Sequence, residues 1–310
     1  MSSLNPKYAI CIPNLNMGDT IEVALRSVLS QVNDAFEVIV VDDGSSDNSL
    51  QVLEELQKEF SILKVFPLRR DRRRTLAQTR NISVGLASAS YVILHIDCDD
   101  YWHPYINDFV KVYHLLESEL GHEFLMSGFQ FHMGERNFLM SHGPYRNGHM
   151  VEDRDMWYRF AKIGAWIPID HVVFRERMPL KRSKVFKKRY LLTIRIVSDE
   201  IRAKVKLRSY FKSLFDAEHS HSLKYRLYKC SILPIALLRA IILGEIEEMA
   251  ASIDWNRLKN EAWQKSGTVI DFFEKRGKSV DISHLSKDGQ WIFSNSSKSF
   301  KISDLNKSDI

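Results

Sequence analysis

The chain has 310 residues, 45% of them apolar, which suffices for one large folded domain and a further segment. Its net charge is +5, and its three cysteines are too few and too widely spaced for a disulfide framework or a paired-cysteine zinc site. The start lacks a basic segment followed by an apolar one, and Pro234 and Arg239 interrupt the longest apolar stretch, 231–243. We therefore expect a cytoplasmic protein that does not cross a bilayer by itself.

In the first 180 residues, segments with the pattern of a buried strand alternate with segments of helical periodicity. The expected strands are Tyr8–Pro13, Phe36–Asp42, Leu63–Phe66, Tyr91–Asp97 and Phe124–Met133. The expected helices are Thr20–Ser30, Ser46–Phe60, Thr75–Ala87 and Glu152–Ile163, with Gly134–Met150 as a glycine-containing loop. Strict alternation favours right-handed crossovers, and hence an α/β fold with a mostly parallel sheet and helices on its faces.

Clusters of acids directly follow two of these expected strands. One strand runs into residues 42–47 (DDGSSD), and another into residues 97–100 (DCDD). Because the carboxyl ends of parallel strands open into a ligand crevice, we expect these carboxylates at one edge of the sheet. Uncompensated carboxylates repel one another, and a hard divalent cation that bridges to phosphate relieves the repulsion. Helix capping is the better interpretation only for the end of the first cluster.

Several short motifs follow one another along the same part of the chain. They are IPNLN at 12–16, ALRSVLSQ at 24–31, VVDDGSSD at 40–47, TRN at 79–81, IDCDD at 96–100 and EDRDMWYR at 152–159. In this order and spacing they resemble the inverting family-two glycosyltransferases of the GT-A fold. The resemblance implies a Rossmann-like GT-A catalytic domain at residues 1–180. It does not extend into residues 181–310, where we expect a mostly helical, basic C-terminal region.

The resemblance also implies roles for individual residues. Those that would hold a nucleotide-diphosphate sugar, of the UDP or GDP type, are Pro13, Asn14, Asn16, Asp43, Arg80 and Asp97. Asp97 would face the ribose, and Asp99 would coordinate Mn²⁺ or Mg²⁺ on the diphosphate, where the metal serves as the acid for the leaving group. Asp153, at the start of an expected helix, would be the catalytic base, and Glu152 is the neighbour most easily confused with it.

Two departures from the family's pattern concern the donor. Leu15 stands where the family usually has an aromatic residue, which leaves the nucleobase open. Residues 72–75 (RRRT) replace a glycine-containing stretch, which predicts a more cationic diphosphate loop. The arginine run could instead bind nucleic acid, but its place directly before residues 79–81 favours a solvated rim or a diphosphate contact. We therefore expect no nucleic-acid partner.

Four side chains with rings lie near the motifs, and each has two interpretations. Trp102 and Trp157 could stack on a sugar ring, and His149 and His171 could contact the acceptor or a metal. For such residues, core packing and structural hydrogen bonds are at least as common.

Charge is unevenly distributed along the chain. Residues 1–180 hold 18 basic and 24 acidic residues, net −6, whereas residues 181–230 hold 15 and 4, net +11. In the basic segment, apolar residues recur at helical spacing at Tyr190, Ile194, Val197, Ile201, Val205, Phe211 and Phe215. Such a stripe suits an anionic membrane surface, here the inner face of the membrane, or packing on the catalytic domain or on a second subunit of a homo-oligomer.

Residues and resemblance together predict a metal-assisted, inverting glycosyltransferase of the hexosyltransferase type. We expect it to move one sugar to a hydroxyl of a glycan or lipid-linked acceptor. A processive synthase is disfavoured because the chain has no Gln-x-x-Arg-Trp motif. Two other classes remain open. A nucleotidyltransferase acting on sugar phosphates would normally carry a Gly-rich, Lys-bearing loop after the first strand. A non-catalytic protein could have kept the fold and nucleotide-sugar binding.

Overall fold

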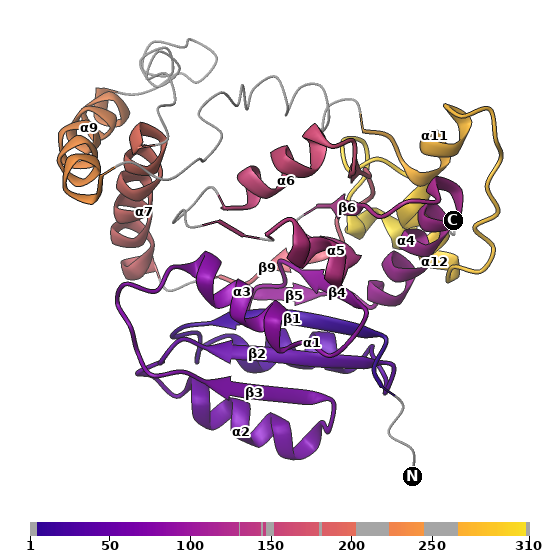
Figure 1. The fold of residues 1–310 in the computed structure, drawn as a ribbon, viewed down its shortest axis with the longest axis horizontal. Helices are drawn as coiled ribbons and strands as arrows, with labels where there is room; N and C mark the ends of the chain where they lie inside the picture. Colours follow the sequence, from indigo (N-terminus) through magenta and orange to yellow (C-terminus); the bar gives the residue numbers. More distant parts are fainter. Residues whose placement is uncertain are drawn as a thin grey trace.

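The computed structural model describes residues 5–129, 131–143, 145–146, 152–179, 182–202, 223–244 and 266–307. At its centre is a seven-stranded mixed sheet in the order β3-β2-β1-β4-β7-β6-β8, with the two-stranded sheet β5-β9 beside it (Figure 1). The strands are β1 (Tyr8–Asn14), β2 (Phe36–Asp42), β3 (Leu63–Pro67), β4 (Tyr91–Leu94), β5 (Asp100–Trp102), β6 (Leu125–Gly128), β7 (Phe131–Glu135), β8 (Trp166–Pro168) and β9 (Arg175–Arg177). The helices are α1 (Ile21–Leu29), α2 (Ser49–Glu59), α3 (Leu76–Leu86), α4 (Ile106–Leu120), α5 (Arg136–Ser141), α6 (Glu152–Lys162), α7 (Arg182–Arg202), α9 (Leu223–Leu243), α11 (Val269–Glu274), α12 (Lys287–Ser294) and the 3₁₀ helix η2 (Ile302–Lys307).

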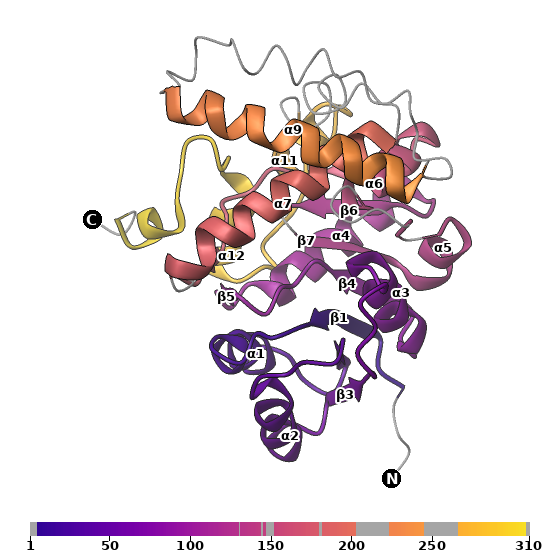
Figure 2. The ribbon, with the colours of Figure 1, turned by 90° about the vertical axis from the view of Figure 1, so that its left-hand side faces the viewer.

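Strands β1 to β4 form the parallel half of the sheet. β1 pairs with β2 on one side and with β4 on the other, and Asn14 lies opposite Asp42 at the carboxyl end of the first pair. All seven residues of β2 are buried, as the continuous apolar run predicts for a strand covered on both faces. Figure 2 shows α1 and α2 on one face of this half and α3 on the other. The predicted α/β fold, a mostly parallel sheet with flanking helices, is confirmed.

The other half of the sheet differs from the sequence expectation. The stretch Phe124–Met133, expected as one strand, is a hairpin in which Ser127 of β6 lies opposite His132 of β7. The expectation is wrong because the chain reverses directly after Ser127-Gly128, a dipeptide typical of turns that a single-strand interpretation passes over. The expected loop Gly134–Met150 contains the end of β7 and the short helix α5.

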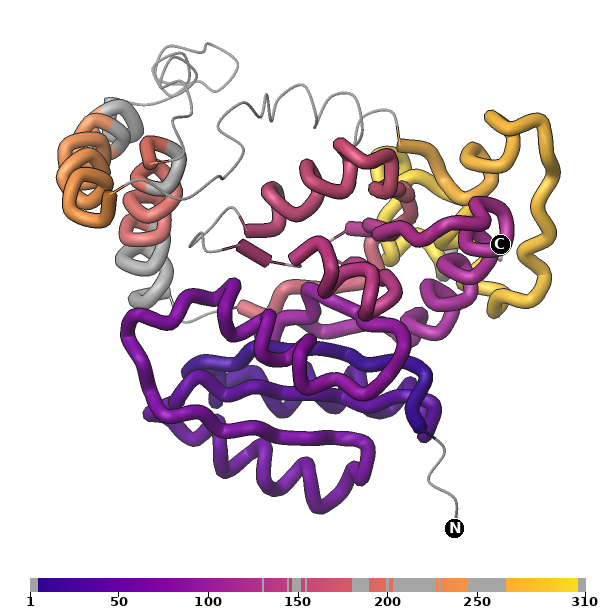
Figure 3. The backbone as a smooth tube through the Cα atoms, in the orientation of Figure 1, coloured from indigo at the N-terminus to yellow at the C-terminus, as the bar shows by residue number. Residues whose placement is uncertain are grey.

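The last described segment returns to the main core. Val269, Phe273 and Phe293 are buried in the same apolar cluster as the central sheet, and the backbone N–H of Val172 donates to the carbonyl of Ile292 over 3.1 Å. Figure 3 shows this segment beside α4, far from α9. Residues 266–307 therefore share the apolar core of the central sheet; in the sequence expectation they belong to the C-terminal region, 181–310.

Helices α7 and α9 have a small apolar core of their own. Ile194 and Val197 of α7 are buried together with Ile232 and Ala236 of α9, and Tyr190 and Ile201 pack against this cluster. These α7 residues belong to the stripe noted in the sequence; its remaining members, Val205, Phe211 and Phe215, lie outside the described residues. Among the described helices, none combines the length and the apolar character needed to span a bilayer.

Candidate active site

The loop after β4 carries the second acidic cluster to the carboxyl edge of the sheet. β4 ends at Leu94, and His95 turns the chain with φ of 69°, a conformation that non-glycine residues adopt only where their surroundings hold them. Cys98 points into the core, with its sulfur 3.8 Å from the carbonyl oxygen of Pro13, and burial raises the pKa of its thiol. Cys98 therefore acts as a small spacer between the two acids of the D-x-D.

Three carboxylates converge at this loop. Asp97, Asp99 and Asp100 each offer one oxygen, and these oxygens lie within 4.8 Å of one another. The guanidinium of Arg177 faces all three carboxylates, at 3.4 Å from Asp97, 2.9 Å from Asp99 and 3.1 Å from Asp100. Like-charge repulsion in the cluster is thereby offset by a cation that the chain itself supplies.

The antiparallel pair β5 and β9 brings this cation to the acids. In its register, Asp100 lies opposite Arg177 and Trp102 lies opposite Arg175, whose guanidinium is 2.7 Å from Asp100. The sequence analysis assigned no role to Arg175 or Arg177. The nearest available signal is the alternating Arg-Glu-Arg at 175–177, which suits a short edge strand, but nothing in the sequence names its partner strand.

Arg80 lies at the centre of a second cluster of charges. Its buried guanidinium is 3.0 Å from Glu152, 3.0 Å from Asp153 and 3.6 Å from Asp97. Burial by itself would lower the pKa of Arg80, but Asp153 and the other nearby acids raise it above its ordinary value. One permanently charged arginine therefore connects the D-x-D to the start of α6.

The two acids at the start of α6 have different environments. The side chain of Glu152 is 4% exposed, and burial followed by the charge of Asp153 raises the pKa of Glu152 to about 8. The side chain of Asp153 is 32% exposed. The raised pKa favours the protonated form of Glu152, and Asp153 is the acid of the pair that meets solvent.

Two buried histidines lie behind Asp153, and sequence reasoning did not find them. His95 Nε2 is 3.5 Å from a carboxylate oxygen of Asp153, and the ring of His132 packs edge to face against His95 at 4.6 Å. Burial, together with the charge of Arg80, lowers the pKa of His95 well below its ordinary value. Burial likewise lowers the pKa of His132. Both rings are therefore neutral near pH 7.

Asp43 directly follows β2, in the first acidic cluster, and two arginines hold its side chain. Its buried carboxylate accepts a 2.6 Å hydrogen bond from Arg70 and a further one from Arg74. Gly44 follows in the left-handed region, with φ of 73°, and an added Cβ would lie 2.6 Å from the backbone of Arg70. Only glycine fits this close approach, so the arginine loop and the strand end are locked together.

The remaining residues predicted for the donor shape the same edge. Pro13 and Asn14 end β1, and the Asn14 amide donates to Asp42 over 2.7 Å. Asn16, with φ of 55°, accepts a 2.8 Å hydrogen bond from the backbone N–H of Ser46 through its side chain. These asparagines therefore tie the loop after β1 to the loop after β2.

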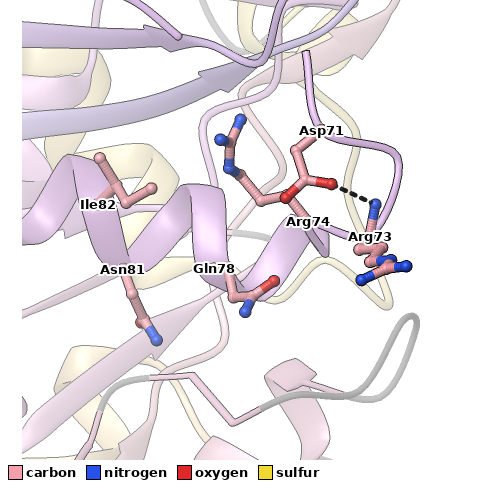
Figure 4. Close-up of a pocket in the computed structure, with 6 residues that line it drawn as sticks. All are labelled: Asp71, Arg73, Arg74, Gln78, Asn81 and Ile82. Atoms are coloured by element: carbon pink, nitrogen blue, oxygen red, sulfur yellow. Dashed lines mark hydrogen bonds between the residues drawn. The ribbon is translucent and has the colours of Figure 1, made fainter. Parts of the chain in front are cut away.

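A hollow of about 370 Å³ lies at the start of α3, next to the arginine pair of Asp43 (Figure 4). It is lined by Asp71, Arg73, Arg74, Gln78, Asn81 and Ile82. Asn81 is fixed by its amide, which donates to the carbonyl of Tyr145 over 2.7 Å. The arginine run thus borders a polar hollow on the side of the sheet where the predicted site residues lie.

Other features noted in the sequence have structural roles. Trp102 is buried in the core, and Trp157 stacks on Trp166 with ring centroids 6.0 Å apart. His171 is buried and accepts a hydrogen bond from the backbone N–H of Phe129 over 3.2 Å. His149 lies outside the described residues.

Comparison with known sequences identifies the family of the first part of the chain. Residues 9–120 match the family described as glycosyl transferase family 2. Over 100 residues the chain is 33% identical to an uncharacterized glycosyltransferase of Nostoc sp., which covers 32% of this chain and 30% of that protein. Over 95 residues it is 32% identical to the GalNAc(5)-diNAcBac-PP-undecaprenol beta-1,3-glucosyltransferase of Campylobacter jejuni. This alignment covers 31% of this chain and 30% of that protein.

The matched segments thus span less than a third of the length of these relatives. Among solved structures, S. aureus TarS 1–349 in complex with UDP-GlcNAc is similar with a TM-score of 0.49 and 16% identity, over 84% of this chain and 93% of that one.

Proposed function

Residues 9–120 belong to glycosyl transferase family 2, and on this premise we propose that the chain transfers one sugar from a nucleotide-diphosphate sugar to an acceptor hydroxyl. The observation that carries the proposal is the buried Arg80, whose guanidinium contacts both Asp97 and Asp153. This shared contact supports a single site in which the donor-side acid and the base act on the same sugar.

The donor half of the proposed site is built from the loops after β1 and β2 and from the arginine run. Asp43 accepts a hydrogen bond from the nucleobase, while Pro13, Asn14 and Asn16 shape the nucleoside side. Arg70 and Arg74, which hold Asp43 at the rim of the hollow, support the proposal because guanidinium groups suit phosphate oxygens. The nucleobase is of the uridine or guanosine type.

A divalent cation, Mn²⁺ or Mg²⁺, fits the chemistry of the acidic cluster. The carboxylates of Asp97, Asp99 and Asp100 offer oxygen ligands within 4.8 Å of one another, which is the donor type that hard cations prefer. In this proposal Asp99 would be the principal ligand, Asp97 would face the ribose, and Arg177 would give up its contacts with the carboxylates to a bound metal. The metal, when bound, neutralises the charge that develops on the leaving diphosphate.

Asp153 is the proposed base. The acceptor hydroxyl loses its proton to the Asp153 carboxylate as its oxygen forms a bond to carbon one of the sugar. The bond between carbon one and the diphosphate oxygen breaks, and the nucleoside diphosphate leaves with the electron pair. A single displacement with Asp153 as the one assigned base inverts the configuration at carbon one.

The acceptor is a glycan or a lipid-linked saccharide. A relative that matches part of this chain is named for a substrate linked to PP-undecaprenol, which supports a lipid-linked acceptor here. We propose release after one sugar, without processive synthesis, in the cytoplasm.

The proposal is tested first by donor binding and then by turnover. A thermal-shift screen of nucleoside diphosphates, with and without Mn²⁺, identifies the donor nucleotide, because a ligand that binds only the folded state raises the melting temperature. Asp99→Ala should abolish the Mn²⁺-dependent shift, whereas Asp153→Asn should keep the shift and lose turnover. Retention of the Mn²⁺-dependent shift by Asp99→Ala would remove the metal assignment.

Two other functions predict different outcomes in the same experiments. A nucleotidyltransferase would release pyrophosphate from a nucleoside triphosphate and a sugar phosphate. A non-catalytic binding protein would show the thermal shift but neither transfer nor slow hydrolysis of the nucleotide sugar with added Mn²⁺. The proposed glycosyltransferase should release no pyrophosphate from these substrates, and it should transfer the sugar to an acceptor.

A further inference from the structure

One face of α9 exposes large aliphatic side chains. The most exposed are Ile241 at 77%, Ile242 at 73%, Leu227 at 61% and Leu238 at 59%. Three more aliphatic residues of the same helix are exposed by 36% or more: Leu237, Leu243 and Ile235. A contiguous apolar surface of this kind is uncommon on a soluble protein and marks a place where something binds.

The opposite face of α9 is already occupied. Ile232, Ala236 and Ala240 follow one another at four-residue intervals, and all three are buried on the side of the helix that packs on α7. α9 is therefore apolar on both faces, but only one face has a partner within the described part of the chain. Figures 1 and 2 show α9 on the outside of the α7–α9 pair.

The segment of the chain that carries this surface is basic in net charge. The sequence of α9 contains four basic residues and no acidic one, and residues 181–230 carry a net charge of +11. On α7, the side chain of Arg195 is exposed. An apolar helix face within a segment of high net positive charge matches an anionic bilayer, into whose headgroup region such a helix sinks in the plane of the membrane.

We propose that the outer face of α9 docks on the surface of an anionic lipid bilayer. A second copy of the chain fits less well, because pairing two α9 helices would bring together two segments of net charge +11. The docking does not depend on the proposed transferase activity. In Figure 1 the α9 helix and the carboxyl edge of the parallel strands lie on the same side of the molecule, so a docked protein would hold this edge near the lipid.

This proposal differs from the membrane contact considered in the sequence. In the sequence analysis, the expected membrane contact is the apolar stripe that begins at Tyr190. The described residues of this stripe, Tyr190, Ile194, Val197 and Ile201, pack against α9. The described part of that stripe is therefore used for helix packing, and the exposed surface lies on the partner helix.

The test is co-sedimentation of the full chain with vesicles, without donor or metal. Vesicles of phosphatidylcholine alone are compared with vesicles containing about one third phosphatidylglycerol, at low and at high salt. We expect binding only to the anionic vesicles, and weaker binding at high salt. Leu238→Glu/Ile242→Glu should reduce the partition coefficient on the order of a hundredfold.

Matched controls separate this effect from misfolding and from charge alone. Val23, 51% exposed on α1, is changed to Glu as a control that should bind as the unaltered chain does. Leu238→Ser/Ile242→Ser removes the aliphatic surface without adding charge and should also lose binding. Circular dichroism checks that each variant is folded.

Three outcomes would overturn the proposal. The first is no binding of the unaltered chain to anionic vesicles. The second is equal binding by the folded Ser variant. The third is a dimer in light scattering that the Ser variant dissociates, which would assign the surface to a second copy.

Discussion

Arg177 on β9 lies 2.9 Å from Asp99, the residue proposed to bind the metal. The same guanidinium contacts Asp97 and Asp100, so it faces all three carboxylates that offer oxygen ligands. A metal ion bound to these carboxylates would repel the Arg177 guanidinium and draw on the same oxygens. Pairing with Arg177 and metal binding should therefore compete.

We predict that Arg177→Gln binds Mn²⁺ about tenfold more tightly than the unaltered chain, because the competing cation is removed and its half-exposed position limits the gain. Electron paramagnetic resonance of free Mn²⁺ measures the affinity directly. Arg175→Gln is the matched control, since Arg175 contacts only Asp100 of the cluster, and its effect should be smaller. Weaker Mn²⁺ binding by Arg177→Gln would instead make Arg177 an organiser of the site.

The two acids at the start of α6 should respond differently to amide substitution. Asp153→Asn removes the proposed base and should lower turnover by about 10²–10⁴-fold. Glu152→Gln replaces a carboxyl group whose raised pKa favours the neutral form, so turnover should stay within about threefold. Steady-state kinetics of the two variants decide between them, and the reverse pattern would assign the base to Glu152.

Stability should decrease with pH because of Glu152. Burial and the charge of Asp153 raise its pKa from the ordinary 4.5 to about 8 in the folded protein. Between these two values the folded protein keeps a proton that the unfolded chain loses, so the free energy of unfolding falls as pH rises through this window. Urea unfolding at pH 5, 7 and 9 should show a smaller decrease for Glu152→Gln. Equal slopes for both proteins would contradict the buried protonated state.

Removing the central cation should destabilise the fold. Arg80→Met leaves the buried Glu152 without its hydrogen-bond donor and Asp153 without its cation, and should cost about 1–3 kcal/mol in the free energy of unfolding. Arg26 offers the contrast, because its ion pairs with Glu22 and Glu59 are exposed, and Arg26→Met should leave the stability unchanged within error. Urea unfolding measures the stability of both variants. Similar losses in the free energy of unfolding would mean that burial does not determine how much these ion pairs stabilise the fold.

Much of the first half of the chain could be predicted from the sequence because its signals are local. Each parallel strand is a continuous apolar run, and the acids follow directly where β2 and β4 end. Carboxyl ends of parallel strands meet at one edge, so Asp43, Asp97 and Asp99 were predicted to lie there. The hairpin of β6 and β7 departs from the expected single strand at Ser127-Gly128, a turn signal outweighed in that expectation by the apolar residues on both sides of it.

Other parts of the site depend on contacts between distant segments. Arg177 reaches Asp99 only through the pairing of β5 with β9, and no periodicity in either three-residue strand indicates its partner. The proton on Glu152 depends on burial and on Asp153. A pKa set by desolvation and neighbouring charges exists only once the chain has folded around the group.

The sequence by itself determined the alternation of strands and helices, the acids at the strand ends and the basic, apolar character of the segment after residue 180. Only the tertiary structure decided which cation faces the acidic cluster. It also decided that the apolar stripe of α7 packs against α9, whereas the outer face of α9 is exposed. The physical reason is that local pattern records which residues avoid water, whereas their partners are chosen by packing between segments far apart in the chain.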